Sequence, residues 1–476
     1  MGGEGCPFAA TRSPSPSAQD PRAWDDRLVT LMTDSKKTPL RPTLKAVRGT
    51  RDLLPDQTPL WNHVESTARA LFARYGFGEI RTPIFETTEL FARGVGEETD
   101  IVSKEMFTWE DRARAASEKA QQLTLRPENT AGVVRAYIEH KLGETGQLQK
   151  LYYIGPQFRR ERPQRGRYRQ FWQIGAEVIG PHSSGSESPL RDAEILEMLA
   201  SFLTELGIRD WRLELNSVGS TEDRVRYNQA LREALAPIKH RLCEDNQRRA
   251  ETNPLRVLDS KDEADQDLIN TLPKIADYLS PDSRDHFTQV LAALDACNVP
   301  YHLNPRLVRG LDYYTRTTFE FTVTTGLGTQ NALLGGGRYD GLSEMLGGPR
   351  APGIGFAIGE DRLILTLQAQ QEADAATSGT TLAAPKLDAY IAPLGPTQNP
   401  AALALARELR TAGLTVEVGD GTFKLRKSFD IADTVARHII LLGEDEVSTN
   451  ILTVKTFATG EQIKLPRTEL SKHLSS

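Results

Sequence analysis

The stretch that decides the fold runs from Leu151 to Gly180 and reads LYYIGPQFRRERPQRGRYRQFWQIGAEVIG. Its two apolar, aromatic-rich flanks predict antiparallel strands, and its polar middle, with Pro163 and Gly166, predicts the connecting loop. Six arginines lie between residues 159 and 169, and Glu161 is the only acidic residue among them. Since the whole chain has a net charge of −6, this hairpin concentrates positive charge locally. Guanidinium groups in such a cluster can bind phosphate through two hydrogen bonds at once.

The second strand of this hairpin has two different faces. Because side chains alternate along a strand, one face carries Trp172, Ile174, Ala176 and Val178, which we expect to face the core. The other face carries Phe171, Gln173, Gly175 and Glu177. We interpret this second face as the floor of a pocket in which Gly175 leaves room for a ligand. The alternative is a solvated strand beside a basic surface loop.

Length and composition indicate a soluble protein of several domains. A chain of 476 residues is expected to form about three domains, and 39% hydrophobic and 26% charged residues are ordinary for globular proteins. No apolar run approaches the roughly 18 residues of a membrane span. The three cysteines form no CxxC motif and indicate a reducing compartment. The sequence contains no HxxxH pair, so it gives no indication of a zinc site. We therefore expect a cytoplasmic protein without a membrane partner.

The pattern along the chain predicts four parts. Residues 1–43 are polar and rich in proline, and we expect a disordered N-terminal tail. Residues 44–366 are expected to form the main domain, with a helix over 60–75, a strand FGEIRTPIFE interrupted by Pro83, and a charged helical insertion at about 218–300. Residues 367–386 lack apolar periodicity and predict a linker. Residues 387–476 alternate strands and helices and predict a small α/β domain.

Common nucleotide-binding and hydrolase motifs do not fit. GIGFAIG at 353–359 lacks the GxGxxG spacing, and LLGGGRYDG at 333–341 lacks the GKS or GKT of a P-loop. A GxSxG nucleophile elbow is absent from the sequence. The paired arginines of RRAETNPLRVLDSKD at 248–262 are interpreted as a solvated face rather than a site.

Four separated stretches together resemble a class II aminoacyl-tRNA synthetase. The helix at 60–75 with the strand ending at Pro83 resembles motif 1, Phe158-Arg159-Arg160-Glu161 resembles motif 2, and Gly353, Gly355, Gly359 and Arg362 resemble motif 3. RGLDYYTRTTFEF at 309–321 and GGGRYDGL at 335–342 are similar to the two signature peptides of the histidyl-tRNA synthetase family. The resemblance covers about residues 45–470.

The resemblance implies an α+β fold: a six-stranded antiparallel sheet flanked by helices, with a helical insertion and a C-terminal α/β anticodon-binding domain. It implies a homodimer formed through motif 1. The implied reaction is ATP-dependent ligation of L-histidine to tRNA(His) through a histidyl-adenylate. Mg²⁺ would accompany ATP, and no metal would be held by the protein alone. Such a reaction depends on positioning and fixed positive charge, because a carboxylate is already a nucleophile at neutral pH.

The resemblance also implies roles for particular residues. Arg159 and Arg309 would be catalytic and contact the α-phosphate, Arg309 at a position that other class II enzymes give to a metal ion. ATP would be bound by Arg159, Glu161, Phe171 and Arg362, with the adenine ring between Phe171 and Arg362. Histidine would be bound by Glu128, Thr130, Gln173, Glu177, Tyr314 and Tyr339, the first three at its ammonium group and the last three at its imidazole. Gln164, Arg165 and Arg167 would approach the acceptor end of the tRNA.

Some features depart from the family pattern or permit another interpretation. Trp172 stands where a smaller residue is expected, and Asp361 stands where glutamate is more usual. Arg309 could simply pair with Asp312. The principal alternative function is a catalytically inactive, synthetase-like regulatory subunit of ATP phosphoribosyltransferase. A second alternative is a class II synthetase for another amino acid, against which Glu177, Tyr314 and Tyr339 argue.

Overall fold

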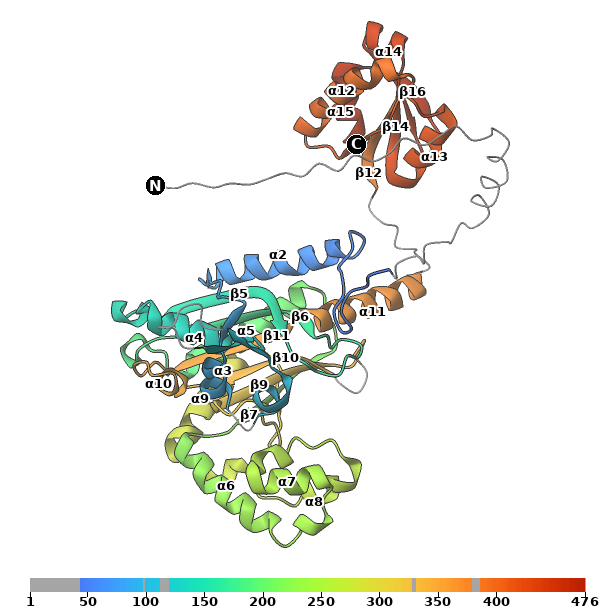
Figure 1. Cartoon of the computed structure of the whole chain (residues 1–476). Helices are drawn as coiled ribbons and strands as arrows, with labels where there is room; N and C mark the ends of the chain where they lie inside the picture. Colours follow the sequence, from blue (N-terminus) through green and yellow to red (C-terminus); the bar gives the residue numbers. More distant parts are fainter. Residues whose placement is uncertain (1–42, 97–98, 112–119, 328–330, 379–385, 476) are drawn as a thin grey trace, which may run out of the picture. The chain divides into compact units, whose positions relative to one another are not determined.

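A computed structural model describes residues 43–96, 99–111, 120–327, 331–378 and 386–475 (Figure 1). The predicted tail of residues 1–43 therefore lies outside the described residues, apart from Thr43. The short described segment before Leu53 contains one isolated bridge, between Arg48 and Thr50.

A mixed eight-stranded sheet forms the centre of the main domain. In spatial order its strands are β1 (Gly78–Glu79), β5 (Gln149–Phe158), β6 (Gln170–Ile179), β11 (Gly353–Gly359), β10 (Ala332–Arg338), β9 (Thr315–Val323), β7 (Trp211–Ser217) and β8 (His302–Leu303). The six central strands are all antiparallel, and the edge strands β1 and β8 pair in parallel with β5 and β7. The predicted six-stranded antiparallel sheet is confirmed and has one short strand added at each edge.

The hairpin predicted between Leu151 and Gly180 is β5 and β6. Its register joins Leu151 to Glu177 and continues without a bulge to Phe158 and Gln170. The connecting loop contains the arginine cluster, as predicted. Ile174, Ala176 and Val178 are fully buried, so the predicted core face of β6 is confirmed. Trp172 is partly buried and packs against the same core.

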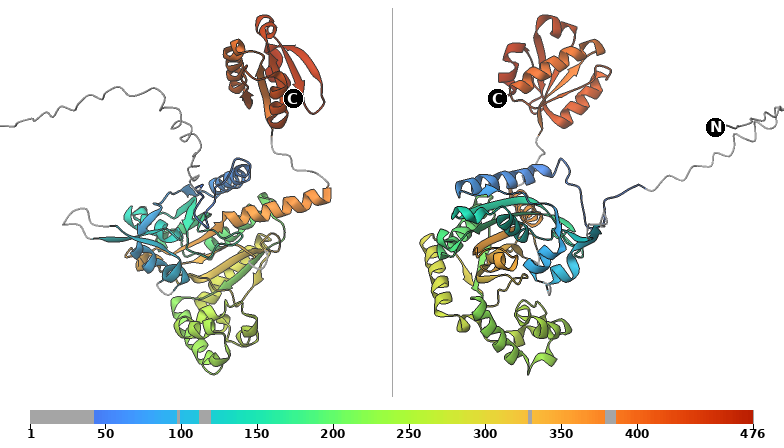
Figure 2. Two further views of the ribbon diagram at one scale, coloured as in Figure 1. Left: turned by 45° about the vertical axis from the view of Figure 1, so that its right-hand side comes forward. Right: turned by 60° about the vertical axis from the view of Figure 1, so that its left-hand side comes forward.

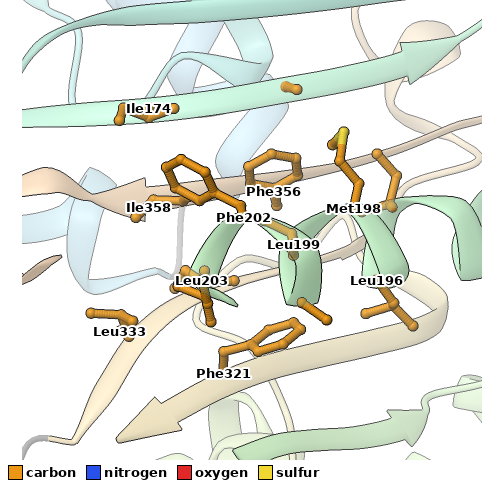
Figure 3. Close-up of a cluster of buried hydrophobic side chains, with 14 of the residues drawn as sticks. Ile174, Leu196, Met198, Leu199, Phe202, Leu203, Phe321, Leu333, Phe356 and Ile358 are labelled. Atoms are coloured by element: carbon orange, nitrogen blue, oxygen red, sulfur yellow. The ribbon is translucent and has the colours of Figure 1, made fainter. Parts of the chain in front are cut away.

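Four helices pack their apolar faces on the core side of this sheet: α2 (Thr58–Arg74), α5 (Pro189–Glu205), α9 (Pro281–Ala296) and α11 (Glu360–Ser378). The start of α5 is set by Ser188, whose hydroxyl accepts the amide of Leu190, and by Pro189 in the first turn. Figure 3 shows α5 laying Leu199, Phe202 and Leu203 against the sheet. Burial of each such side chain contributes about 1.5–3 kcal/mol to the free energy of unfolding. This core fixes the sheet whose opposite face carries the site.

A three-stranded antiparallel sheet, with β4 in the middle, lies beside the helices α3 and α4. Its strands are β2 (Phe85–Thr87), β4 (Gln121–Leu125) and β3 (Phe107–Asp111), and the helices are α3 (Thr88–Val95) and α4 (Thr130–Glu139). The single strand predicted for FGEIRTPIFE is wrong. That segment splits into β1 and β2, which belong to different sheets, because Pro83 between them cannot donate a ladder hydrogen bond.

The predicted helical insertion forms a module with its own apolar core. It consists of α6 (Thr221–Leu235), α7 (Glu244–Thr252), α8 (Gln266–Ile269) and several 3₁₀ turns, and α9 leads back to the sheet. A reciprocal cap begins α6: the Ser220 hydroxyl accepts from the Asp223 amide, and the Asp223 carboxylate accepts from the Ser220 amide. Tyr227, Leu231 and Leu235 of α6 are buried in the module's core.

The linker predicted for residues 367–386 is wrong for its first part. α11 runs without a break to Ser378, and residues 379–385 lie outside the described ranges (Figure 2). The sequence there, QAQQEADAA, has no apolar stripe, but alanine, glutamine and glutamate are strong helix formers. Since Leu363, Ile364 and Leu367 anchor the preceding turns in the core, the helix continues beyond them into solvent.

The C-terminal region is an α/β domain, as predicted. A five-stranded sheet has the order β13 (Val416–Val418), β12 (Leu387–Pro393), β14 (Ala436–Leu442), β15 (Ile451–Thr456), β16 (Gln462–Pro466). Its helices are α12 (Asn399–Thr411), α13 (Leu425–Val435), α14 (Glu444–Thr449) and α15 (Arg467–Leu474). Ile391, Leu405 and Ile440 lie at the centre of its core. Within the described parts of the chain, no helix has the length and apolar character needed to cross a membrane.

Candidate active site

A cavity of about 460 Å³ lies on the face of the main sheet opposite the helices. This volume is within the range of small-molecule sites, roughly 300–1,000 Å³. The predicted residues that line it are Glu128, Thr130, Arg159, Glu161, Arg167, Phe171, Gln173, Arg309, Tyr314, Tyr339 and Arg362. Residues separated by more than 200 positions are thus brought together, since the strands that carry them are neighbours in the sheet.

The floor of the cavity depends on glycines that let larger side chains lie against the strands. A Cβ added to Gly335 would lie 2.5 Å from Nη2 of Arg309, and one added to Gly355 would lie 1.7 Å from Oε2 of Glu177. The same close approach occurs between Gly337 and Tyr314, between Gly353 and Tyr339, and between Gly175 and Tyr153. The prediction that Gly175 leaves room for a ligand is therefore wrong, because the Tyr153 ring occupies that space.

Glu128 is buried at the beginning of α4. Its two carboxylate oxygens accept the backbone amides of Thr130 and Ala131, at 2.8 and 3.0 Å. The carboxylate thus satisfies two amides that a helix start leaves unpaired. Burial raises the pKa of Glu128, and these two amides oppose the rise. The carboxyl group is held in place at the cavity wall by these two bonds.

Glu177 is fully buried and contacts two residues of the cavity wall. The Thr130 hydroxyl donates to its Oε1 and the Tyr339 hydroxyl donates to its Oε2, both at 2.7 Å. Burial raises the pKa of Glu177 to about 8; the two hydroxyl donors oppose this rise, and the neighbouring charge of Glu128 adds to it. Glu177 therefore acts on the cavity through the hydroxyls that it orients.

Arg159 and Phe171 are neighbours at one end of the cavity. The Arg159 guanidinium carbon lies 5.3 Å from the centre of the Phe171 ring, and its Nε donates to the carbonyl of Pro127 at 2.9 Å. Glu161 lies 3.4 Å from Arg167 and 4.0 Å from Arg159. The remaining donors of Arg159 are available for an anion, since these contacts use only part of the guanidinium.

Arg309 forms an ion pair with Glu320 on β9, and not with Asp312. Asp312 instead accepts a hydrogen bond from the Asn253 amide at 3.1 Å. The Nε of Arg309 is buried and forms no hydrogen bond within the described chain. The alternative of a pairing with Asp312 is therefore wrong, although Arg309 does have a carboxylate partner in the cavity.

Arg362 lies in the first turn of α11, and its Nη1 donates to the carbonyl of Ala332 at 2.6 Å. Its neighbour Asp361 accepts the backbone amide of Trp172 at 3.0 Å and so joins α11 to β6. This contact gives a structural role to the aspartate at a position where glutamate is more usual. Phe171 and Arg362 both line the cavity, as the adenine sandwich requires.

Gln164 and Arg165 are exposed on the loop between β5 and β6 and do not line the cavity. Gln164 and Arg167 exchange backbone hydrogen bonds of 3.2 and 2.9 Å across the loop's turn. Of the three loop residues predicted to approach a tRNA, only Arg167 lines the cavity.

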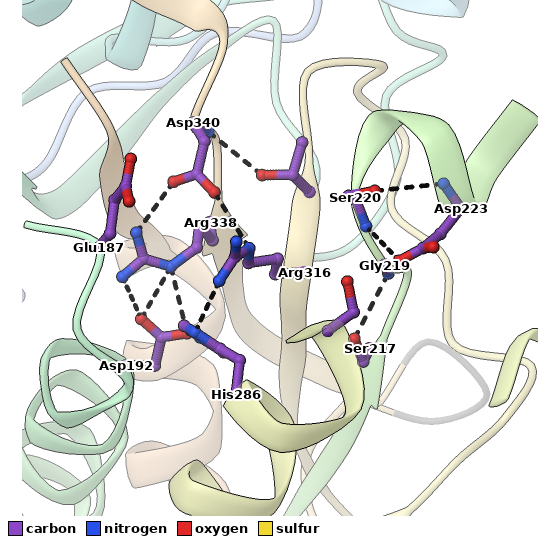
Figure 4. A network of polar contacts seen from close by, with 12 residues as sticks. Glu187, Asp192, Ser217, Gly219, Ser220, Asp223, His286, Arg316, Arg338 and Asp340 are labelled. Atoms are coloured by element: carbon purple, nitrogen blue, oxygen red, sulfur yellow. Dashed lines mark hydrogen bonds and ion pairs between the residues drawn. The ribbon is translucent and has the colours of Figure 1, made fainter. Parts of the chain in front are cut away.

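A buried ion network supports the strand end that carries Tyr339 (Figure 4). Arg338 Nε donates to Asp192 at 3.0 Å, and Nη1 donates to Asp340 at 2.9 Å. His286 lies 2.8 Å from the other Asp192 oxygen and 3.0 Å from Arg316. Since arginine can only donate, the His286 Nδ1 accepts from Arg316 and its Nε2–H donates to Asp192.

Asp192 differs from Glu177 in its charge state. Burial alone would raise its pKa, but Arg338 and His286 outweigh burial and lower the pKa of Asp192 to about 2. This carboxylate is charged and compensated at neutral pH.

Several residues that line the cavity were not predicted, among them Tyr153 and three charged residues of the helical module. Tyr153 is buried, and its hydroxyl forms no hydrogen bond to any described residue. The hairpin register could have identified it, because Tyr153 pairs with Gly175 on the same face. Arg256, Asp259 and Lys261 enter from the helical module, and no sequence signal identified them, since their run resembles an ordinary charged surface.

Among the described residues, no group of three or more histidine, cysteine, aspartate or glutamate side chains is arranged to hold a metal ion.

Comparison with known proteins identifies the family. A family model described as histidyl-tRNA synthetase matches residues 49–363, and one described as an anticodon binding domain matches residues 388–476. The histidine–tRNA ligase of Koribacter versatilis is 64% identical over 432 residues, which cover 90% of this chain and 96% of that protein.

Two solved structures are similar in fold. Apo histidyl-tRNA synthetase of Staphylococcus aureus has a TM-score of 0.72 and 36% identity, covering 91% of this chain and 100% of that one. A Bacillus halodurans protein described as an ATP phosphoribosyltransferase regulatory subunit/histidyl-tRNA synthetase has a TM-score of 0.59 and 20% identity, covering 85% and 99%. At 20% identity, the similarity to the second structure shows only a shared fold. On the family model and the 64% identical relative, this chain belongs to the histidyl-tRNA synthetase family.

Proposed function

We propose that this chain is a histidine–tRNA ligase that uses ATP to join L-histidine to tRNA(His) through a histidyl-adenylate. The observation that carries the proposal is a single cavity with arginines at one end and a buried carboxylate–phenol cluster at the other. In the first step a histidine carboxylate oxygen attacks the α-phosphorus, and pyrophosphate leaves with the electron pair of the broken P–O bond. In the second step a hydroxyl oxygen of the terminal adenosine of the tRNA attacks the acyl carbon, AMP leaves with the electron pair of the broken C–O bond, and the hydroxyl proton is released.

The arginine end binds MgATP. Arg159 and Arg309 contact the α-phosphate, where charge increases in the transition state, and preorganised cations are most effective there. Glu161 accepts from the edge of the adenine, and Phe171 and Arg362 stack on its two faces. Mg²⁺ enters with the triphosphate.

The carboxylate–phenol end binds histidine. Glu128, Thr130 and Gln173 surround the ammonium group, and the unpaired Oε1 of the buried Gln173 is an acceptor available to it. Tyr314 and Tyr339 contact the imidazole. Because the Tyr339 hydroxyl donates its hydrogen bond to Glu177, its oxygen remains free to accept an imidazole N–H. Glu177 thereby sets the hydrogen-bonding direction of the pocket.

The tRNA and the second subunit use other surfaces. The exposed loop of Gln164 and Arg165 leads from the cavity towards the acceptor end, and the C-terminal domain contacts the anticodon. Exposed apolar side chains next to the motif 1 segment favour a homodimer: Leu54, Ile84 and Phe85, with Trp109, whose ring contacts Phe85. We place the enzyme in the cytoplasm, where its tRNA is used.

The regulatory-subunit alternative is not favoured. The chain keeps both arginines, the histidine-binding set and the C-terminal domain that matches an anticodon-binding model. A regulatory subunit needs neither an α-phosphate contact nor an anticodon domain.

ATP–pyrophosphate exchange with each amino acid in turn tests the proposal. Exchange is expected with histidine and Mg²⁺, and amino acids unable to hydrogen-bond in the pocket should be rejected by roughly 10⁴-fold or more. Equal exchange with leucine or phenylalanine would contradict the assigned specificity. Absence of exchange from a folded protein would favour the regulatory alternative.

A further inference from the structure

The helical module contributes charged side chains to the active-site cavity. Arg256, Asp259 and Lys261 line it, whereas the other lining residues belong to the main domain, from Glu128 to Gln173 and from Leu307 to Arg362. Arg256 lies in a 3₁₀ turn, Pro254–Val257, that follows α7. The position of Arg256 in the cavity lining indicates that the module takes part in the site and is not only a surface module.

The module is attached to the segment that carries Arg309. Arg224 Nη1 donates to the carbonyl of Asp312 at 3.0 Å, and the Asn253 amide donates to the Asp312 carboxylate at 3.1 Å. On the other side, Arg306 Nη2 donates to the carbonyl of Leu258 at 3.2 Å. Hydrogen bonds of Asn253 and Leu258, on either side of Arg256, therefore hold this part of the module against the segment that carries Arg309.

The Arg256 guanidinium lies against Gly310, the residue after Arg309. A Cβ added to Gly310 would lie 3.5 Å from Nη1 and 3.8 Å from Nη2 of Arg256. Nη1 is buried and forms no hydrogen bond to the described residues, and its ion-pair contact with Asp259 is long, at 3.6 Å. An arginine that keeps a buried donor unpaired beside a cavity is suited to an anionic ligand, because a ligand would satisfy that donor.

We propose that Arg256 binds the β- and γ-phosphates of ATP and the pyrophosphate formed from them. This inference rests on the proposed function. With Arg159 and Arg309 placed at the α-phosphate, Arg256 is a further cation in the cavity lining, and exposed Lys261 of the same segment adds positive charge. The leaving group gains the electron pair of the broken bond, so a cation there stabilises it.

The phosphodiester of a tRNA end has the same chemistry and is the other possible source of the anion. The carboxylates of Asp259 and Glu320 line the same part of the cavity, and they would repel a bare RNA phosphate but not a triphosphate that carries Mg²⁺. The observations therefore favour the nucleotide, and the two sources are separated by reactions with and without tRNA.

The test uses the full chain with Arg256→Ala and Arg256→Gln, and Arg241→Ala as a matched control in the same module, where Arg241 is exposed. Pyrophosphate concentration is varied in ATP–pyrophosphate exchange, and histidine transfer to tRNA is measured separately from preformed adenylate. We expect the KM for pyrophosphate to rise about 10- to 100-fold in both Arg256 variants. The KM for histidine, the transfer rate and the control variant should be unchanged.

Three results would overturn the inference. An unchanged KM for pyrophosphate in a folded Arg256→Gln variant excludes the contact, even if Arg256→Ala fails to fold. Slower transfer with normal exchange assigns the arginine to RNA. Slower adenylate formation with unchanged pyrophosphate affinity means that Arg256 only positions Arg309. A parent chain that does not exchange with histidine refutes the proposed function itself, before any variant is compared.

Discussion

Two buried carboxylates bind neighbouring residues at the end of β10, and they differ in almost every other respect. Asp192 binds Arg338 and Glu177 binds Tyr339, and both carboxylates are fully buried. The pKa of Asp192 falls to about 2 and that of Glu177 rises to about 8. Arginine compensates the first charge within the fold, whereas hydroxyls only partly compensate the second. The carboxylate that supports the fold finds its counter-charge within the protein. The carboxylate that serves binding has no counter-charge there, and its hydroxyl partners remain available to a ligand.

Removing the compensated charge should give the largest effect. Asp192→Asn leaves Arg338 buried without its main counter-charge, and breaking a buried ion pair in this way costs about 3–5 kcal/mol of unfolding free energy. Urea unfolding measures the loss. Asp374→Asn, which removes the exposed partner of Arg209, is the control and should cost less than about 1 kcal/mol. Similar losses of unfolding free energy in the two variants would show that the buried Asp192 network stabilises the fold no more than an exposed ion pair does.

Arg309 is an intermediate case, since it has a carboxylate partner but stands in the cavity. Arg309→Ala should slow single-turnover adenylate formation by on the order of 10²-fold or more, about 3 kcal/mol. Histidine and ATP affinities should change little, because the charge that it stabilises develops only in the transition state. Arg309→Lys should recover only part, since an ammonium lacks the planar fork.

The loss of Arg309 also leaves Glu320 without its partner. A double variant, Arg309→Ala with Glu320→Gln, separates the missing cation from the unpaired carboxylate. If a folded Arg309→Ala variant formed adenylate at the parental rate, Arg309 would have no role in the mechanism.

Removing the uncompensated carboxylate should affect binding more than folding. Glu177→Gln replaces an acceptor that orients Tyr339, and histidine affinity should fall by about 10- to 100-fold. The unfolding free energy should change little, because a buried carboxylate without a cation is itself costly. Tyr339→Phe is the matched variant, and the double variant shows whether the two act as one unit. Unchanged histidine binding in Glu177→Gln would contradict the role assigned to this pair.

The two carboxylates should also differ in the pH dependence of stability. The folded pKa of Asp192, about 2, lies below its ordinary 3.8. Its contribution of about 2 kcal/mol is therefore present above that value and lost as pH falls towards 2. The folded pKa of Glu177, about 8, lies above its ordinary 4.5. The folded state then holds a proton that the unfolded state releases, so stability should fall as pH rises from 4.5 to 8. Thermal unfolding across pH should lose this alkaline decline in Glu177→Gln and keep it in Asp192→Asn.

Local sequence patterns predicted the elements that build the site. Alternation along β6 identified its core face correctly, because a strand with one face on the core has a period of two. The antiparallel sheet followed from the family resemblance and the C-terminal α/β domain from alternating strands and helices, and both are confirmed. The pattern failed at FGEIRTPIFE, where one proline divides the run between two sheets, and in α11, where helix propensity alone continues the helix beyond its apolar anchor.

Contacts between distant segments could not be predicted in the same way. Gly175 was assigned to a ligand because strand alternation says nothing about the partner strand, from which the Tyr153 ring enters. Arg309 was weighed against its near neighbour Asp312, but the sheet offers it Glu320. Arg256 belongs to a charged helical run with no motif, and only the packing of the module on the Arg309 segment brings it to the cavity.

The glycine floor has a consequence for how the site tolerates inherited variation. Four glycines of the floor have no side chain to take part in the reaction: Gly335, Gly337, Gly353 and Gly355. Because each lacks a Cβ, a different side chain of the site can lie directly against its backbone. Even alanine at Gly355 would require Glu177 to move, since its Cβ would lie 1.7 Å from a carboxylate oxygen. In a saturation mutational scan these positions should be as intolerant as the residues that touch substrate. Each would fail in a different way: Gly335 through Arg309 and the nucleotide, and Gly355 through Glu177 and the amino acid.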